Sequence, residues 1–113
     1  MTFHIFFDNL VLQVVDTGIL YMTKVRAHII IGGAVQGVFF RAHTREIALN
    51  HSVHGWVQNR MDGAVEAVFE GDETAVKKVI DWCRHGPPAA RVHDVIVNYL
   101  NYTGEFNGFI IKM

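Results

Sequence analysis

The sequence has little of what marks several specialised classes of protein. Its 113 residues contain one cysteine, Cys83, so no disulfide forms within the chain and a disulfide-stapled secreted scaffold is excluded. Positive charge is not in excess, since ten lysines and arginines face eleven aspartates and glutamates. Binding to a nucleic-acid backbone needs such an excess on one face, so we expect no nucleic-acid partner. The length suits one hydrophobic core, and we expect a single domain in the cytoplasm.

The apolar first 22 residues lack the marks of an export signal or a membrane anchor. No lysine or arginine precedes Lys24, whereas a signal peptide begins with a basic region. Acidic and amide side chains interrupt the apolar run before it reaches the roughly 18 residues of a transmembrane helix, so we expect no membrane partner. Residues 1–22 are interpreted either as an extra element docked on the domain or as an upstream extension before a natural start at Met22. The patterned domain is expected to occupy residues 23–113.

Hydrophobic periodicity predicts the order of the secondary structure after this segment. The pattern indicates a strand at 25–31, a helix at 40–50, a hairpin of strands at 53–59 and 64–70, a helix from Asp72 to Gly86, a strand at 91–100 and a closing strand at 109–113. This β-α-β-β-α-β order with a short terminal strand is typical of the α+β, ferredoxin-like split β-α-β plan. We therefore expect an antiparallel sheet with two helices on one face and the other face partly open.

The connection between the first strand and the first helix, GGAVQGVFFR at residues 32–41, is rich in glycine. Glycines allow left-handed conformations that turn several backbone N–H groups toward one point, and a helix N-terminus adds a partial positive charge. Arg41 follows at once, and its guanidinium fits the oxygens of a phosphate. The pattern indicates an anion cradle. It lacks the Gly-Lys-Ser/Thr ending of a nucleotide-binding loop, so we expect no nucleotide there.

Two segments, GAVQGVFFR and GWVQNRMDGAVE, together resemble the signature segments of the acylphosphatase family, small ferredoxin-like enzymes that hydrolyse carboxyl-phosphate anhydrides. The resemblance continues through EGDETAVKKVIDWCRHGPPAARV and GFIIKM, and it covers about residues 25–112. It implies that the chain is an acylphosphatase acting on small acyl phosphates. The alternatives are a phosphate-binding or regulatory module with little turnover, and a domain of a larger carbamoyl-phosphate-using maturation protein.

The resemblance also implies roles for particular residues. The phosphate-binding loop would be formed by the backbone N–H groups of Gly33, Ala34, Val35, Gln36, Gly37 and Val38. Arg41 would clamp the phosphate, and Asn59 would position the attacking water. An acyl phosphate is already activated, so positioning and charge stabilisation suffice, and we expect no metal and no cofactor. Asn59 ends its predicted strand, which brings it near the loop if the two strands are neighbours.

The chain departs from the family pattern at two positions. Ala34 stands where the family commonly has a basic residue, which removes one source of positive potential and is the motive for the low-turnover alternative. Ser52 stands where a glycine usually ends the first helix, and a left-handed serine there costs roughly 1 kcal/mol. We expect a monomer, with a dimer through the open sheet face or the apolar leader as the alternative.

The remaining chemically active side chains have structural interpretations. The seven histidines are scattered without a helix-face pair, so no metal site is predicted, although His43 lies close to Arg41 in the sequence. Phe39 and Phe40 are expected to pack beneath the loop. Cys83 is interpreted as a buried small hydrophobe rather than a nucleophile.

Overall fold

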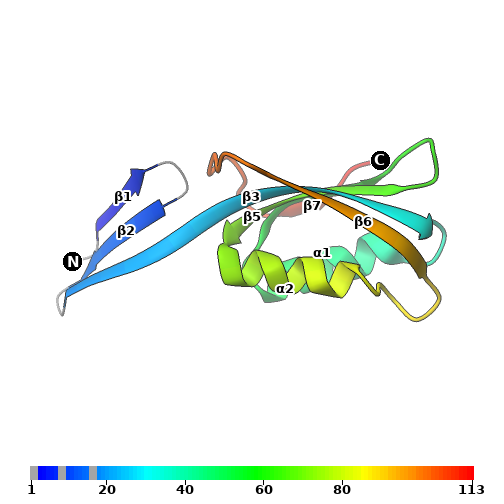
Figure 1. Cartoon of the computed structure of the whole chain (residues 1–113), viewed down its shortest axis with the longest axis horizontal. Coiled ribbons are helices and arrows are strands. Elements are labelled where there is room, and N and C mark those ends of the chain that lie inside the picture. Colours follow the sequence, from blue (N-terminus) through cyan, green and yellow to red (C-terminus); the bar gives the residue numbers. More distant parts are fainter. Residues whose placement is uncertain (1–2, 8–9, 16–17) are drawn as a thin grey trace.

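The computed structural model describes residues 3–7, 10–15 and 18–113, with side chains from residue 23 onward. Its elements, shown in Figure 1, are β1 (Phe3–Phe7), β2 (Leu10–Val15), β3 (Gly18–Ala34), α1 (Phe40–Asn50), β4 (His54–Asn59), β5 (Val65–Asp72), α2 (Glu73–Cys83), β6 (Arg91–Leu100) and β7 (Phe109–Ile111). From β3 onward the order is the predicted β-α-β-β-α-β with a short terminal strand. Both helices cover one face of the sheet (Figure 1), which confirms the α+β, ferredoxin-like expectation.

The sheet is mixed rather than wholly antiparallel. β3 pairs antiparallel with both β5 and β6, and β4 pairs antiparallel with β5. β7 instead pairs parallel with β4. The direction follows from the chain path, because the segment after β6 returns across the sheet and the chain reverses before it forms β7. The final strand thus runs in the direction of β4, which the expectation of an antiparallel sheet had not included.

β3 is much longer than the predicted strand at 25–31, and its two halves have different partners. β2 pairs with β3 from Gly18 to Thr23, while β5 pairs from Lys24 onward. β1 and β2 lie beyond the helix-covered part of the sheet (Figure 1). The side chains of residues 1–22 lie outside the described part of the chain, and both interpretations of that segment stay predictions. Across the described ranges, no helix has the length and apolarity needed to cross a membrane.

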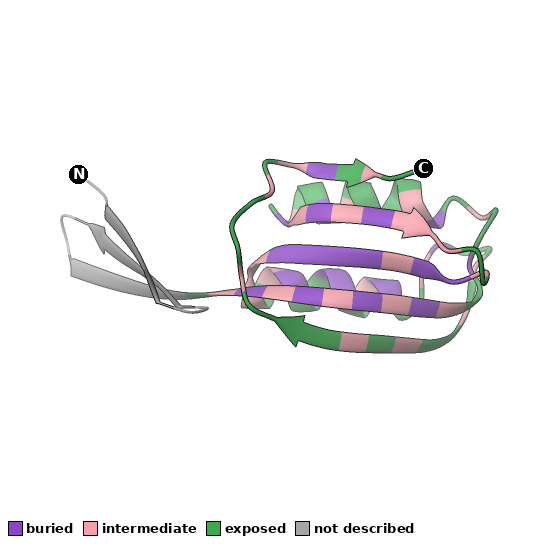
Figure 2. Cartoon of the chain, turned by 90° about the horizontal axis from the view of Figure 1, so that it is seen from above, coloured by how far each residue is buried: buried purple, intermediate pink, exposed green. Residues whose placement is uncertain are grey.

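The core lies between the sheet and the two helices. Along β3 the buried positions alternate, as the period-two pattern predicted, and they meet the buried faces of α1 and α2 (Figure 2). The buried side chains of these three elements are Val25, Ala27, Ile29, Ile31, Phe40, Thr44, Ala48, Val76, Val79, Ile80 and Cys83. Burial raises the pKa of the Cys83 thiol to about 12. Cys83 is thus a buried core residue, as expected, and a thiol with a raised pKa stays protonated at neutral pH.

The turn after α1 offers a test of local strain. Ser52 has a φ of 55°, in the left-handed region that favours glycine. We expect Ser52→Gly to raise the free energy of unfolding by about 1 kcal/mol, measured by urea denaturation. Asn50→Gly is the matched control, because Asn50 ends α1 in a helical conformation and glycine there should lower stability. A Ser52→Gly protein no more stable than the parent would contradict this account.

Candidate functional site

β3 contains a β-bulge close to its end, just before the loop that joins it to α1. The pairing of β3 with β6 changes register between Gly32 and Gly33, and Gly33 has a φ of 127°. A Cβ atom at Gly33 would lie 2.2 Å from the backbone oxygen of Arg91 and 2.9 Å from the backbone nitrogen of His93. Only glycine fits so close to the neighbouring strand. The bulge therefore fixes where the loop begins.

The rest of this loop has the backbone of an anion-binding nest. Gly37 and Phe39 have φ values of 76° and 63°, and Val38 between them has no positive φ. Among the described residues, the backbone N–H groups of 36–39 find no hydrogen-bond acceptor. Alternating handedness of this kind aims successive N–H groups at a common point, and the loop feeds directly into the N-terminus of α1. These free donors suit an anion with several oxygens.

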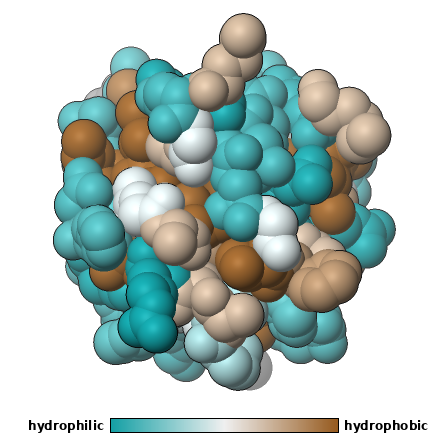
Figure 3. All heavy atoms as spheres, turned by 90° about the vertical axis from the view of Figure 1, so that its right-hand side faces the viewer, coloured by the Kyte–Doolittle hydropathy of each residue, from teal (hydrophilic) through white to brown (hydrophobic). Residues whose placement is uncertain are grey.

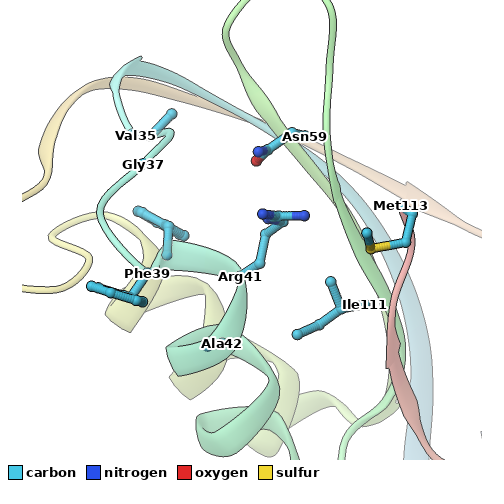
Figure 4. A pocket seen from close by; sticks show the side chains of 9 residues that line it. Val35, Gly37, Phe39, Arg41, Ala42, Asn59, Ile111 and Met113 are labelled. Carbon is cyan, nitrogen blue, oxygen red and sulfur yellow. The ribbon is translucent and has the colours of Figure 1, made fainter.

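Arg41 lies in the first turn of α1 with its guanidinium in the middle of a pocket (Figure 4). The residue is half-buried, and within the described ranges no carboxylate pairs with it. A partly buried cation without a counter-charge favours binding of an anion. By contrast Arg45, one turn further along α1, donates from Nε to the backbone oxygen of Phe109 at 2.9 Å. The two arginines of the helix therefore differ in function.

Asn59 ends β4 on the side of the sheet that faces the helices. Strand alternation places it on the same face as Val57, which is fully buried. Its side chain points toward the guanidinium of Arg41 (Figure 4). The Asn59 Oδ1 atom is itself buried and accepts no hydrogen bond from the described residues. An unpaired buried acceptor of this kind is uncommon in folded proteins, and it indicates a functional role.

β3 and β4 are not neighbours, because β5 lies between them. The sequence predicts Asn59 near the loop only if the two strands adjoin, and that condition is not met. The side chain of Gln36 makes the connection instead. Its Nε2 donates to the backbone oxygens of Arg60 at 2.8 Å and Ala64 at 2.9 Å, and so ties the loop to the turn that follows Asn59. Sequence analysis treated Gln36 only as a backbone donor.

The opposite face of the same hairpin fixes the orientation of β4. Gln58 donates from Nε2 to Oε1 of Glu66 at 2.7 Å, and His28 Nε2 lies 2.6 Å from the other carboxylate oxygen. The hydrogen bond from His28 holds the pKa of Glu66 below its ordinary value, with a further contribution from Gln58. The carboxylate thus stays ionised and holds Gln58 away from the helices. Successive residues of a strand point to opposite faces, so the following residue, Asn59, lies on the helix side whether or not this bond is made.

Arg41 and Asn59 share a pocket of about 330 Å³. Of the predicted loop residues, Val35 and Gly37 also line it, whereas Gly33, Ala34, Gln36 and Val38 do not. Sequence analysis missed the other lining residues, which are Phe39, Phe40, Ala42, Ile111 and Met113. On this end of the molecule (Figure 3), hydrophobic side chains lie exposed among hydrophilic ones. The pocket therefore combines a small polar centre with an apolar margin.

The expectation that Phe39 and Phe40 both pack beneath the loop is wrong for Phe39. The Phe40 ring is buried and meets the ring of Trp82 edge-on, with 5.5 Å between centroids. Phe39 is 77% exposed. The helix must turn Phe40 into the core, so the residue before it, in a left-handed conformation, points away. His43 is also exposed, and its Nδ1 lies 3.0 Å from the backbone oxygen of Phe39 rather than in the pocket.

Comparisons with known proteins agree with this geometry. The family model Acylphosphatase matches residues 27–111. An acylphosphatase of Pelotomaculum thermopropionicum is 54% identical over 90 residues, covering 80% of this chain and 98% of that protein. One of Pyrobaculum calidifontis is 57% identical over 88 residues, covering 77% and 80%. The crystal structure of acylphosphatase from Bacillus subtilis superposes with a TM-score of 0.76 at 34% identity, covering 79% of this chain and 99% of that chain.

A much longer protein contains a segment whose structure is similar to that of this chain. The crystal structure of HypF from T. kodakarensis superposes with a TM-score of 0.69 at 32% identity, covering 79% of this chain. The match takes up 12% of the HypF chain, whereas it takes up nearly the whole of the small relatives. Within the described residues, no three His, Cys, Asp or Glu side chains gather into a group that could hold a metal ion.

Proposed function

The chain belongs to the acylphosphatase family, and on that premise we propose how its own residues cleave an acyl phosphate. The protein is an acylphosphatase, which hydrolyses the carboxyl-phosphate bond of small acyl phosphates to a carboxylate and inorganic phosphate. The low-turnover module is not favoured, because relatives more than 50% identical are named acylphosphatases. The roles of individual residues form the proposal.

The phosphoryl group binds between the loop and α1. We assign its oxygens to the backbone N–H groups of residues 33–38 and to the guanidinium of Arg41. Support comes from the unpaired donors at 36–38, the left-handed Gly37 and the half-buried arginine without a carboxylate partner. Charge-assisted hydrogen bonds in a partly enclosed site stabilise the negative charge that spreads over the phosphoryl oxygens during transfer. Ala34 contributes its backbone only.

Asn59 positions the attacking water. The observation that carries this proposal is the buried and unpaired Oδ1 of Asn59 beside Arg41 in the same pocket. That oxygen accepts a hydrogen bond from a water, which turns the water's lone pair toward phosphorus. The bond from the water oxygen to phosphorus forms as the bond to the acyl oxygen breaks. The carboxylate leaves with the electron pair, and the water's protons pass to the phosphate product.

The reaction as proposed needs no titrating base, metal or cofactor. The carboxylate is a good leaving group, and an amide orients water without changing its protonation state. We further propose that the enzyme works in the cytoplasm as a monomer, which the buried free thiol of Cys83 and the balanced charge support.

Hydrolysis of acetyl phosphate in the presence of EDTA tests the proposed function. We expect turnover well above the uncatalysed rate, at the same rate with and without the chelator, measured as loss of acetyl phosphate. Phosphoserine is the matched control, because it presents a similar phosphoryl group on a poor alcohol leaving group, and we expect no turnover of it. Binding of inorganic phosphate without turnover of acetyl phosphate would contradict the proposal. Loss of activity in EDTA would contradict independence from metal.

A further inference from the structure

An exposed aromatic ring forms one side of the pocket. Phe39 lines the pocket with Arg41, yet 77% of its surface is open to solvent. Exposure of a phenyl ring in water is unfavourable, and Phe40 beside it is buried. The phosphate-binding groups and Asn59 give no reason for an aromatic side chain at this position. The ring therefore has a use that the proposed phosphate and water sites do not explain.

The backbone of Phe39 is strained and held in place from both sides. A φ of 63° is uncommon for a bulky residue and persists only where the surroundings determine it. The backbone oxygen of Phe39 accepts a hydrogen bond from the N–H of His43 at 3.1 Å, and His43 Nδ1 lies 3.0 Å from the same oxygen. On the other side, the buried ring of Phe40 fixes the start of α1. The direction of the Phe39 Cα–Cβ bond is thus set before any ligand binds.

The direction of the reaction indicates which part of a substrate meets this ring. In phosphoryl transfer the attacking and leaving oxygens lie roughly in line through phosphorus. If Asn59 holds the water, the acyl group leaves on the side of the phosphorus away from Asn59. In Figure 4 the side chain of Phe39 lies on the far side of the pocket from Asn59, at the end of the loop. Ile111 and Met113 lie on the other side of Arg41.

We propose that the ring of Phe39 contacts the acyl group of the substrate and determines specificity for it. The enzyme therefore favours acyl phosphates with an aromatic or bulky apolar acyl group over acetyl phosphate. Contact with such a group removes the exposed ring from water, which favours binding. Because the backbone of Phe39 is already fixed, little conformational entropy is lost when the acyl group binds. This inference rests on the proposed function and names the substrate class that its pocket selects.

Two substitutions at position 39 distinguish an effect of the aromatic ring from an effect of the left-handed backbone. Phe39→Asn removes the ring with a residue that tolerates a left-handed φ, and Phe39→Tyr keeps a ring. The measured quantity is kcat/KM for benzoyl phosphate divided by kcat/KM for acetyl phosphate. We expect this ratio to fall about three- to tenfold in Phe39→Asn, the range of one aromatic contact, and to stay within about twofold in Phe39→Tyr. Inhibition by inorganic phosphate, which has no acyl group, should stay the same in both.

Tyr99 provides a matched control, because it is an exposed aromatic residue at the end of β6 away from the loop. Tyr99→Asn should leave the ratio unchanged. A ratio unaltered by Phe39→Asn would overturn the inference, and so would equal losses on both substrates together with weaker phosphate inhibition. A ratio that falls in Met113→Ala instead would place the acyl group on the opposite wall and also overturn it. Turnover of neither substrate by the parent protein would contradict the proposed function itself.

Discussion

Replacement of Arg41 by alanine is expected to lower kcat/KM for acetyl phosphate about 1000-fold and to abolish inhibition by inorganic phosphate. Arg41 has the one charged side chain that lines the pocket among the described residues. No second cationic side chain is therefore in place to compensate for its loss. In the proposed mechanism Arg41 contacts the phosphoryl group in both the bound substrate and the transition state, so binding and rate should fall together. Steady-state kinetics with phosphate as a competitive inhibitor measure both.

Two further substitutions make this test specific. Arg41→Lys keeps the charge but loses the planar pair of donors, so we expect activity between those of the parent and Arg41→Ala. Arg45→Ala removes an arginine from the next turn of the same helix, where the side chain serves β7 and not the pocket. Its kinetics should match those of the parent. An Arg41→Ala protein that still binds phosphate as tightly as the parent would contradict the assigned role.

Local patterns were enough to predict most of the helices and strands. The stripe of Phe40, Ile47 and Ala48 predicted α1 with its observed bounds, and the alternation of residues 91–100 predicted β6 with its bounds. These elements are set by side chains that repeat every 3.6 or every two residues, a signal contained within the segment itself. The turn of the predicted hairpin also depends on local chemistry, since the carboxylate of Asp62 accepts a hydrogen bond from the N–H of Ala64 at 3.1 Å.

Features that depend on distant partners were not predictable in the same way. The first half of β3 pairs with β2, and β7 pairs parallel with β4. Both pairings depend on how the chain folds back to bring these strands side by side. The left-handed conformation of Phe39 follows from the packing of Phe40 against Trp82, which no pattern near residue 39 reveals. Propensity alone disfavours such a conformation for phenylalanine.

The candidate site lies between these two cases. Its glycine-rich loop and its arginine are consecutive, so the sequence alone indicated an anion cradle. Asn59 is far along the chain, and its proximity to Arg41 depends on the order β3-β5-β4 and on the hydrogen bonds of Gln36 to the hairpin turn. Family resemblance pointed to the pairing of Arg41 with Asn59 before any geometry did. The physical reason for that pairing, a side chain that ties the loop to the hairpin, became visible only in three dimensions.

Asn59→Ala is expected to lower kcat on acetyl phosphate about 100-fold while KM and inhibition by phosphate change little. In the proposed mechanism the carboxamide orients the attacking water, a contribution that grows in the transition state, whereas the loop and Arg41 hold the phosphoryl group. Stability should not fall, because the Oδ1 of Asn59 accepts no hydrogen bond from the described residues and its removal leaves no partner unpaired. A thermal denaturation curve run beside the kinetics checks this.

Gln58→Ala is the matched control for Asn59, since the neighbouring amide points to the opposite face of β4 and bonds to Glu66 instead of lining the pocket. It should cost some stability and leave kcat unchanged. The contrast between the two adjacent amides separates a kinetic role from a structural one. Asn59→Ala should lower kcat without lowering stability, whereas Gln58→Ala should lower stability without lowering kcat. Equal kcat values for Asn59→Ala and the parent protein would mean that the water is positioned by another group. A large rise in KM with unchanged kcat would instead assign Asn59 to substrate binding.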